Sequence, residues 1–265
     1  MRFDDVANTQ TARTAATARA APAGYSLSGF GFTSCGLVAA SVGTTERFDD
    51  VANTHTARTA ATARNSLAGY SLNGLGFTTC GNDDVANVGT TQRFDDVANT
   101  QTARIDATAR QQLAGYSLNN YGFSSCGTSG GIVGTTERLD DAANTQTART
   151  AATARRQLAG YSIRGYGYTS CGFIAANTGT TEYLNDVANT QNARTAATAR
   201  TGIGAYSLNG FGFSSCGFIA ANTGTTERHD FVANTQTGRT AATARRLICG
   251  YSTNEYFVNY RTYNA

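Results

Sequence analysis

Pairs of arginines recur along the chain, and they are its residues best suited to binding a charged group. The two arginines of a pair stand six positions apart, as in Arg104 and Arg110, and six such pairs are present. A guanidinium group recognises carboxylate, phosphate or sulfate through two parallel hydrogen bonds. If the repeats close around a channel, the second members predict an anion-binding ring at its mouth: Arg19, Arg64, Arg110, Arg155, Arg200 and Arg245. The alternative is structural, with the guanidinium groups joining neighbouring units through Asp, Glu or backbone carbonyls.

Adjacent carboxylates are the second candidate for chemistry, because two of them at one turn could bind Ca²⁺ or exchange protons. They occur as Asp49-Asp50, Asp95-Asp96 and Asp140-Asp141. A catalytic pair is needed only once, so a recurring pair is expected to accept backbone hydrogen bonds at a turn or to pair with arginine. Asn82-Asp83-Asp84 lies in a variable stretch and is a better Ca²⁺ candidate, although its spacing is not that of an EF-hand loop. The prediction is therefore no metal site.

Signals for catalysis are weak. Gly115-Tyr116-Ser117-Leu118-Asn119 approaches the Gly-x-Ser-x-Gly pattern of a nucleophilic serine. That serine recurs in every unit inside a predicted strand, and only two histidines, His55 and His229, could activate it. Gly74 and Gly76 lack the third glycine and the following helix of a dinucleotide-binding loop. We therefore predict no catalytic residue and no cofactor.

The six cysteines fit neither a disulfide framework nor a zinc site. In a ring, equivalent positions are held farther apart than the roughly 7 Å between Cα atoms that a disulfide allows. No Cys-x-x-Cys motif is present, and two histidines are too few for a structural zinc site. The cysteines are expected to be buried, reduced and used as small apolar side chains. Five of them occupy the same place in successive units: Cys35, Cys80, Cys126, Cys171 and Cys216.

These residues recur because the chain is built from six similar units. The block Arg-Phe-Asp-Asp, or a variant of it, begins at positions 2, 47, 93, 138, 183 and 228, with steps of 45, 46, 45, 45 and 45 residues. Each copy continues, with small variations, through Val-Ala-Asn-Thr-Gln-Thr-Ala-Arg, a Gly-Tyr-Ser-Leu-like segment and an aromatic segment that generally ends in Cys-Gly. Repetition at this period indicates one repeat architecture and a single domain spanning 1–265.

One unit is expected to form four short strands. In the third copy they fall at Leu113–Leu118, Tyr121–Cys126, Thr135–Leu139 and Asn144–Thr150. Asn119-Asn120 joins the first two, and the equivalent Asn-Gly pairs in other copies are the strongest short signal for a β-hairpin. The following Ala-Ala-Thr-Ala-Arg stretch is too short for a stable helix and is expected to be an irregular connection.

Four antiparallel strands per unit, repeated six times, predict an all-β, six-bladed β-propeller. A β-solenoid is the alternative, but the position of the two ends favours a ring. The N-terminal residues supply a third and a fourth strand, whereas Leu247–Tyr251 and Tyr256–Tyr260 supply a first and a second. Pairing them in one blade would close the ring and remove a free sheet edge. The blades are expected at about 20–64, 65–110, 111–155, 156–200 and 201–245, with 246–265 joining 1–19.

The unit resembles the Kelch repeat over almost the whole chain. In the fourth copy the matching frame is Arg155, Leu158–Ile163, Gly165–Gly172, Thr181–Asp186 and Asn189. A Kelch blade similarly runs from an arginine through a small-residue inner strand to an aromatic-led strand, an aromatic–acidic corner and an asparagine. Here Cys-Gly stands in place of the Gly doublet, and glutamine stands near the place of the outer-strand tryptophan. The resemblance implies a propeller and suggests an anion-binding mouth, but propellers host enzymes, lectins and adaptors alike.

Composition narrows the classes of function. Hydrophobic residues make up 40% and charged residues 15%, which excludes a disordered acidic chain. A net charge of +3, from 21 basic and 18 acidic residues, is too small to predict nucleic-acid binding. No apolar run approaches the ~20 residues of a membrane span, and the first residues do not resemble a signal peptide. Membrane insertion is not expected, and the localisation stays open between an intracellular protein and one displayed on a virion or surface assembly.

Strand direction alternates within a blade, so the loops divide between two faces. The Asn-Gly and Asp-Asp-Val-Ala-Asn turns fall on one face, and the stretches that differ between units fall on the other. Loops that vary on a repeated scaffold are where a specific ligand is recognised. Six residues on this face are the candidates for contact with a protein partner: Phe173, Ile174, Phe218, Ile219, Arg156 and Arg246.

These features favour a non-catalytic binding or structural module, a scaffold that contacts a protein partner in a larger assembly. A second hypothesis is a glycan- or anion-binding adhesin, a lectin that uses aromatic and arginine side chains in several blades. A third is an enzyme with one asymmetric channel site, which the repeated polar set and the scarcity of histidine oppose. An adhesin predicts equivalent pockets, a scaffold predicts an apolar contact surface, and an enzyme predicts one strongly perturbed cluster.

Overall fold

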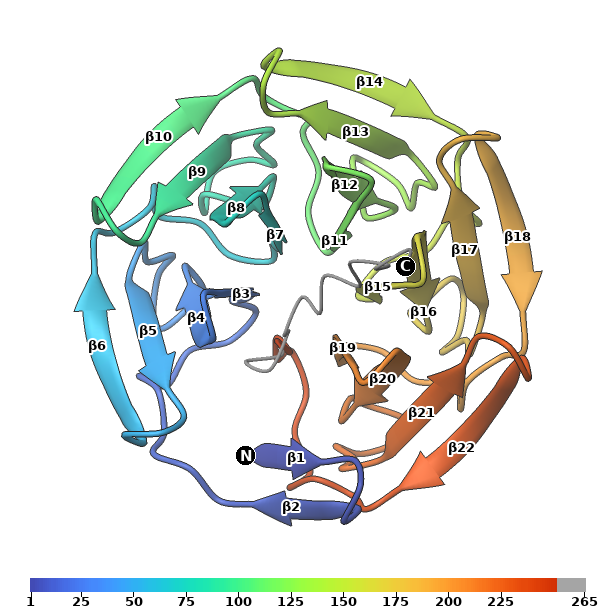
Figure 1. The fold of residues 1–265 in the computed structure, drawn as a ribbon. Helices are drawn as coiled ribbons and strands as arrows, with labels where there is room; N and C mark the ends of the chain where they lie inside the picture. The colour runs from blue at the N-terminus through green and yellow to red at the C-terminus, as the bar shows by residue number, and fades with distance from the viewer. Residues whose placement is uncertain (252–265) are drawn as a thin grey trace, which may run out of the picture.

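The computed structural model describes residues 1–251 and shows antiparallel sheets arranged radially around a central axis (Figure 1). Five sheets have four strands each, ordered along the sequence from the axis outward. They are β3 (Ala23–Leu27), β4 (Phe30–Ser34), β5 (Thr45–Asp49) and β6 (Thr54–Arg58); β7 (Ala68–Leu72), β8 (Leu75–Thr79), β9 (Thr91–Asp95) and β10 (Thr100–Arg104); β11 (Ala114–Leu118), β12 (Tyr121–Ser125), β13 (Thr136–Asp140) and β14 (Thr145–Arg149); β15 (Ala159–Ile163), β16 (Tyr166–Ser170), β17 (Thr181–Asn185) and β18 (Thr190–Arg194); and β19 (Gly204–Leu208), β20 (Phe211–Ser215), β21 (Thr226–Asp230) and β22 (Thr235–Arg239).

A β-propeller of four-stranded antiparallel blades is therefore confirmed, but residues 1–251 form five complete blades rather than the predicted six. The remaining sheet has two strands, β1 (Arg2–Asp4) and β2 (Thr9–Thr11). The four strands expected in the third copy are observed as β11–β14, with ends that differ by one residue. The Ala-Ala-Thr-Ala-Arg stretch after them has no regular secondary structure, as expected.

The hairpin turns form where the sequence predicts them. In the second blade Asn73 and Gly74 join β7 to β8, with φ of 52° and 76°. Both values lie in the left-handed region that a type I′ turn requires and that Asn and Gly adopt most easily. Leu72 pairs with Leu75 directly across the turn, which fixes the register of the two strands.

The core lies between neighbouring blades. On the inner strands of the first four blades alternate residues are buried, as in Ala114, Tyr116 and Leu118. The Tyr116 ring stacks on Phe123 of β12, with 5.3 Å between ring centroids. It also lies over Gly167 of the next blade, where a Cβ atom would come within 2.1 Å of the ring. Glycine is required there because an aromatic side chain of one blade packs onto the bare backbone of the next.

The outermost strands are largely exposed, which suits their Thr-rich sequence. On β10, the Gln101 side chain donates a hydrogen bond of 3.3 Å to the Thr59 carbonyl of the preceding blade. Gln191 and Gln236 make the equivalent bonds from the fourth blade to the third and from the fifth blade to the fourth. The recurrent outer-strand glutamine therefore ties adjacent blades together.

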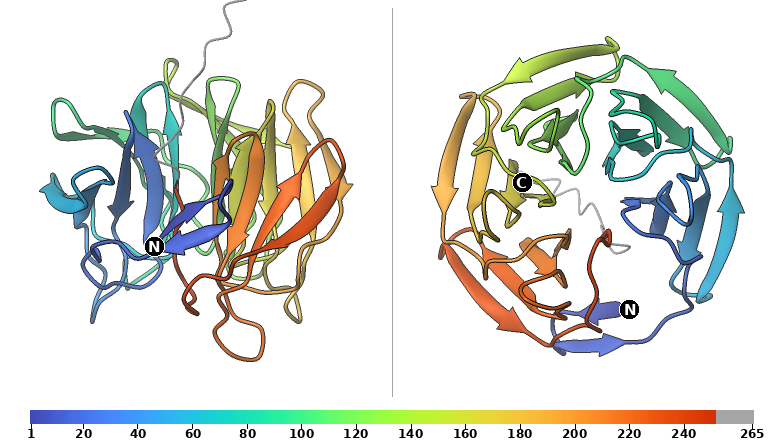
Figure 2. Two further views of the ribbon diagram at one scale, coloured as in Figure 1. Left: turned by 60° about the horizontal axis from the view of Figure 1, so that its bottom comes forward. Right: turned by 180° about the vertical axis from the view of Figure 1, so that it is seen from behind.

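The two ends of the described chain lie in the gap between the fifth and first blades (Figures 1 and 2). β1 and β2 occupy the outer part of this gap, and residues 247–251 run along its inner part without being assigned as a strand. The expected partner of that segment, Tyr256–Tyr260, lies outside the described residues. Leu247 is held on both sides, because its N–H donates to the Gly202 carbonyl and its carbonyl accepts from the Ala21 N–H, both at 2.8 Å.

Candidate functional site

Four of the six arginines predicted to ring the channel mouth are completely buried: Arg64, Arg110, Arg155 and Arg200. Arg110 donates through Nη2 to the carbonyl and hydroxyl of Ser124 on β12, and through Nη1 to Glu137 on β13. Burial alone would raise the pKa of Glu137, but hydrogen bonds from Arg110 and Thr108 outweigh it and hold the pKa below its usual value. The same pairing joins Arg19 to Glu46, Arg155 to Glu182 and Arg200 to Glu227.

Arg64 and Arg245 depart from this pattern. Arg64 has Gln92 where the other four complete blades have glutamate, and burial lowers the pKa of the Arg64 guanidinium. Its Nη2 donates to the carbonyl and hydroxyl of Thr78 at 3.2 and 2.6 Å, but its Nε and Nη1 are buried with no hydrogen-bond partner among residues 1–251. Arg245 is exposed. The six arginines therefore share a position in the repeat but not one environment.

The centre of the channel mouth is formed by backbone and aliphatic side chains. Six residues with positive φ form a cycle of backbone hydrogen bonds of 2.7–3.0 Å, each N–H donating to the carbonyl of the preceding unit. They are Ala21, Ser66, Gln112, Gln157, Gly202 and Leu247. The residues after them line a small cavity of about 70 Å³: Pro22, Leu67, Leu113, Leu158, Ile203 and Ile248. The structure thus places aliphatic side chains at the centre of the mouth, where the sequence analysis expects the arginine ring.

The first arginine of each pair joins its blade to the next one. Asp96 of the second blade accepts from Arg47 at 3.3 Å and from Arg58 at 2.6 Å, both in the first blade. Asp95, the other member of the aspartate pair, accepts from backbone N–H groups of its own turn. Both structural roles expected for the paired carboxylates are confirmed. The same three-residue ion cluster recurs around Asp5, Asp50, Asp141 and Asp186.

Aromatic residues replace the ion cluster between the fourth and fifth blades. Phe231 stands at the place of the aspartate, and Tyr183 at that of one arginine. The Arg194 guanidinium carbon lies 4.6 Å from the Phe231 ring centroid and 4.8 Å from that of Tyr183. Cation–π attraction therefore holds this junction where Coulomb attraction holds the others.

His229 lies in the same junction and is the strongest sign of local asymmetry. Its side chain is 1% exposed and 5.1 Å from the Tyr168 ring centroid. Burial, followed by the charge of Arg194, lowers the pKa of His229 to about 4. An imidazole enclosed in this way is out of reach of a bound substrate, whereas a general base must lie within hydrogen-bond distance of one. The geometry of His229 therefore supports a packing role.

The variable loops are built from short paired segments. In the fourth blade Arg156 pairs with Phe173, which pairs in turn with Asn177. Neighbouring loops are also joined, because Asn177 Nδ2 donates to the carbonyls of Phe218 and Ile219, both at 3.0 Å. Equivalent bridges hold five loops, which together we call the variable-loop face: residues 37–43, 82–89, 128–134, 173–179 and 218–224.

Arginine–aromatic stacks cover part of this face. The Arg156 guanidinium carbon lies 5.1 Å from the Phe173 ring centroid, and that of Arg246 lies 4.9 Å from Phe218. Four of the residues predicted as partner contacts therefore lie together as two stacked pairs, one on the loop of the fourth blade and one on the loop of the fifth. The stacking leaves both phenylalanine rings half-buried.

Aliphatic side chains are exposed at the tips of the same loops. Ile174 and Ile219, the other two predicted contacts, are 41% and 44% exposed. Val38 and Val85 are exposed on the loops of the first and second blades. The variable-loop face therefore presents apolar side chains on segments whose backbone is already fixed by hydrogen bonds.

Exposed valines on the opposite face are functional candidates that the sequence analysis missed. They are 73–99% exposed and occupy the turn between the third and fourth strands of a unit. The sequence does contain a signal for these residues, because each is a valine placed directly after the paired acidic positions of the turn. Each stands alone in a polar turn, and single exposed apolar side chains are common on protein surfaces. They are Val6, Val51, Val97, Val187 and Val232.

The structure gives little support to a reactive cysteine or to a metal site built from carboxylates. The five equivalent cysteines are buried and unpaired, as predicted, and burial raises the pKa of Cys126 to about 11, which keeps that thiol unreactive. Asp83 accepts from two backbone N–H groups, and Asp84 accepts from Ser41. Among residues 1–251, no group of three or more His, Cys, Asp and Glu side chains is placed to hold a metal ion.

Comparison of the sequence with protein-family models and with curated proteins found no match. No helix in the part of the chain that the structure describes is long and apolar enough to cross a membrane. A functional proposal therefore rests on the fold and on the geometry of its faces.

Proposed function

We propose that this chain is a non-catalytic binding module, a β-propeller scaffold that contacts a protein partner in a larger assembly through its variable-loop face. The observation that carries the proposal is the pair of adjacent Phe-Ile-Ala-Ala loops, whose Ile174 and Ile219 side chains are exposed on segments fixed by hydrogen bonds. Apolar groups on a preorganised surface lose little conformational freedom on binding. Arg156 and Arg246 flank them, and arginine is enriched among the residues that dominate protein interfaces.

The proposal includes a six-bladed ring of Kelch type, with residues 1–19 and 246–265 forming the sixth blade. Two observations support it. The ion clusters around Asp5 and Asp50 connect the β1–β2 sheet to both neighbouring blades as the complete blades are connected to one another. Leu247 also takes the sixth place in the cycle of backbone hydrogen bonds.

Burial of the arginines favours a protein partner over an anion-binding adhesin. The guanidinium groups of Arg110, Arg155 and Arg200 are already paired with carboxylates and are fully buried. Binding an external anion at these positions would require breaking those pairs, which is strongly unfavourable.

The proposal is tested by comparing two double variants that differ in face but not in blade. Ile174→Ser/Ile219→Ser removes exposed aliphatic groups from the variable-loop face, and Val187→Ser/Val232→Ser removes them from the opposite face of the same two blades. The first should weaken the association of the chain with its native assembly by roughly thirty-fold, from about 2 kcal/mol of lost apolar burial. The second should leave it unchanged. Equal effects of the two variants would refute the assignment of the face.

A further inference from the structure

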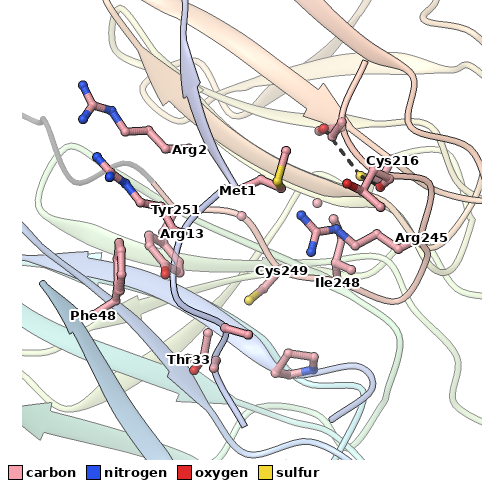
Figure 3. A pocket seen from close by; sticks show the side chains of 18 of the residues that line it. Met1, Arg2, Arg13, Thr33, Phe48, Cys216, Arg245, Ile248, Cys249 and Tyr251 are labelled. Atoms are coloured by element: carbon pink, nitrogen blue, oxygen red, sulfur yellow. Dashed lines mark hydrogen bonds between the residues drawn. The ribbon is translucent and has the colours of Figure 1, made fainter. Parts of the chain in front are cut away.

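Two of the arginines that stand second in their pairs have a residue other than glutamate at the place of their partner. For Arg245 this residue is Met1, and Arg245 is exposed on the wall of a cavity of about 710 Å³ between the fifth and first blades (Figure 3). For Arg64 it is Gln92, and Arg64 is completely buried. Solvent therefore stabilises the charge of Arg245 but does not reach that of Arg64.

The terminal nitrogen Nη1 of Arg64 lacks an acceptor. In the third blade the same atom of Arg110 donates to the Thr108 carbonyl at 3.1 Å and to the Glu137 carboxylate. Among residues 1–251, Nη1 of Arg64 is the only buried terminal guanidinium nitrogen without a hydrogen-bond partner. Leaving a buried charge unpaired is strongly unfavourable, so this atom requires an acceptor from elsewhere.

The Gln92 amide presents a donor where glutamate presents an acceptor. Glu137 uses both carboxylate oxygens, Oε1 for the threonine of the preceding link and Oε2 for Arg110. Gln92 has a single side-chain oxygen, which accepts from the Thr62 N–H at 2.8 Å. Its other terminal atom, Nε2, is an N–H donor. Two donors, Nη1 of Arg64 and Nε2 of Gln92, thus take part where the other complete blades have a donor and an acceptor.

We propose that Arg64, Gln92 and Thr62 form a binding site for a small monovalent inorganic anion of the chloride class. The anion accepts from Arg64 Nη1, from Gln92 Nε2 and from the Thr62 hydroxyl, whose equivalents in the other complete blades donate to glutamate. One negative charge balances one guanidinium group, whereas a sulfate dianion would bury a second charge without a cation to pair it. Gln92 is half-buried and Thr62 is exposed, so displacement of one amide group at the surface admits the anion.

Asp106 is a charged neighbour of this site and stands where the other blades have alanine. It is exposed, and it accepts from the Thr91 N–H at 3.3 Å. Burial lowers the pKa of the Arg64 guanidinium, and the negative charge of Asp106 offsets this effect only in part. Asp106 therefore weakens the attraction of an anion but does not supply the hydrogen bond that Nη1 of Arg64 lacks.

Thermal unfolding in sodium chloride and in sodium gluconate of equal ionic strength tests the site, because gluconate is too large to enter it. Chloride at about ten times its dissociation constant should raise Tm by about 3–6 °C. Gln92→Glu supplies the acceptor within the chain, so its Tm should be the same in both salts. A Tm of the unchanged chain that does not respond to chloride, or an equal response in Gln92→Glu, would overturn the proposal.

Glu137→Gln should create a second site, because it gives the third blade the donors of the second. Its Tm should fall in gluconate and recover in part in chloride. Ala151 stands in the third blade where the second has Asp106, so this new site lacks the repelling charge. Asp106→Ala should likewise strengthen chloride binding at the native site roughly two- to five-fold. Failure of chloride to restore any stability to Glu137→Gln would contradict the assigned donors.

The width of the chloride NMR resonance measures binding without unfolding the protein. Exchange of chloride onto the unchanged chain should broaden the resonance, and bromide should reverse this by competition. The excess width should largely disappear in Gln92→Glu, which is expected to fold because it restores the residue of the other complete blades. Equal broadening by the two chains would place the anion elsewhere and refute the site. Because the site lies within the second blade, neither result bears on the protein partner proposed for the variable-loop face.

Discussion

The second blade lacks one carboxylate that the other complete blades possess, and restoring it should stabilise the protein. Gln92 stands opposite the buried Arg64, whose Nη1 has no hydrogen-bond partner among the described residues. In the third blade the same atom of Arg110 pairs with Glu137. The substitution Gln92→Glu places a carboxylate where the repeat itself shows that the geometry accepts one.

The size of the effect follows from opposing contributions. A hydrogen bond to a charged group contributes about 1.5–3 kcal/mol, and removing one partner of a buried ion pair costs about 3–5 kcal/mol. Part of this stabilisation is already present in the unchanged protein, because Gln92 Oε1 accepts a hydrogen bond from the Thr62 N–H at 2.8 Å. Burying the new carboxylate offsets another part. We expect a net stabilisation of about 2 kcal/mol, or roughly 4–8 °C in Tm for a chain of this size.

Thermal and urea unfolding followed by circular dichroism measure this change. Glu137→Gln is the reciprocal variant and should lower Tm, because it leaves Arg110 buried without its carboxylate. In an Arg64→Met background Gln92→Glu should give no stabilisation, since the cation is gone. The reasoning is refuted if Gln92→Glu leaves Tm unchanged or lowers it while Glu137→Gln behaves as expected.

Three further predictions concern pH, backbone and ion clusters. Burial lowers the pKa of His229 from 6.5 to about 4, so that as pH falls the unfolded chain takes up this proton before the folded chain does. The free energy of unfolding should therefore decrease by as much as about 3 kcal/mol between pH 6.5 and pH 4. His229→Leu should remove that part of the pH dependence of Tm. Gly76→Ala should destabilise the protein more than Gly74→Ala does, because a Cβ atom at position 76 would lie 2.3 Å from the Tyr25 ring. A Cβ atom at position 74 meets no other atom, and the only cost there is the positive φ of 76°. Urea unfolding of the two variants would contradict this expectation if it gave the reverse order. Asp141→Asn should destabilise the protein by about 1–2 kcal/mol in dilute buffer and by less in 1 M NaCl, because salt screens its partly exposed ion cluster. A loss of stability that does not depend on salt would argue against a Coulombic role.

The strands and hairpins could be predicted from the sequence because their causes are local. Asn73-Gly74 supplies the two left-handed residues of the turn, and alternation in Ala114–Leu118 marks the buried face of an inner strand. The unpaired state of Cys126 follows from repetition, since residues at the same place in successive units of a ring are held too far apart to form a disulfide.

The sequence could not predict that the second arginine of each pair points into its blade rather than toward the axis, because this direction depends on one backbone angle. Between Arg110 and Leu113 the chain passes through Gln112 with a φ of 60°, and no glycine signals this conformation. The chain turns there, so that Leu113 lines the axis while Arg110 lies inside its own blade. The half-burial of Phe173 also depends on tertiary contact, since the Arg156 side chain folds over its ring.

The most direct test of the central proposal is photo-cross-linking within the native assembly. A benzophenone amino acid is placed at Ile174 on the variable-loop face or at Val187 on the opposite face of the same blade, both of which are exposed. The account predicts a discrete cross-link to one partner protein from position 174 and none from position 187. A cross-link from position 187 alone, or cross-links of equal yield from both, would contradict it.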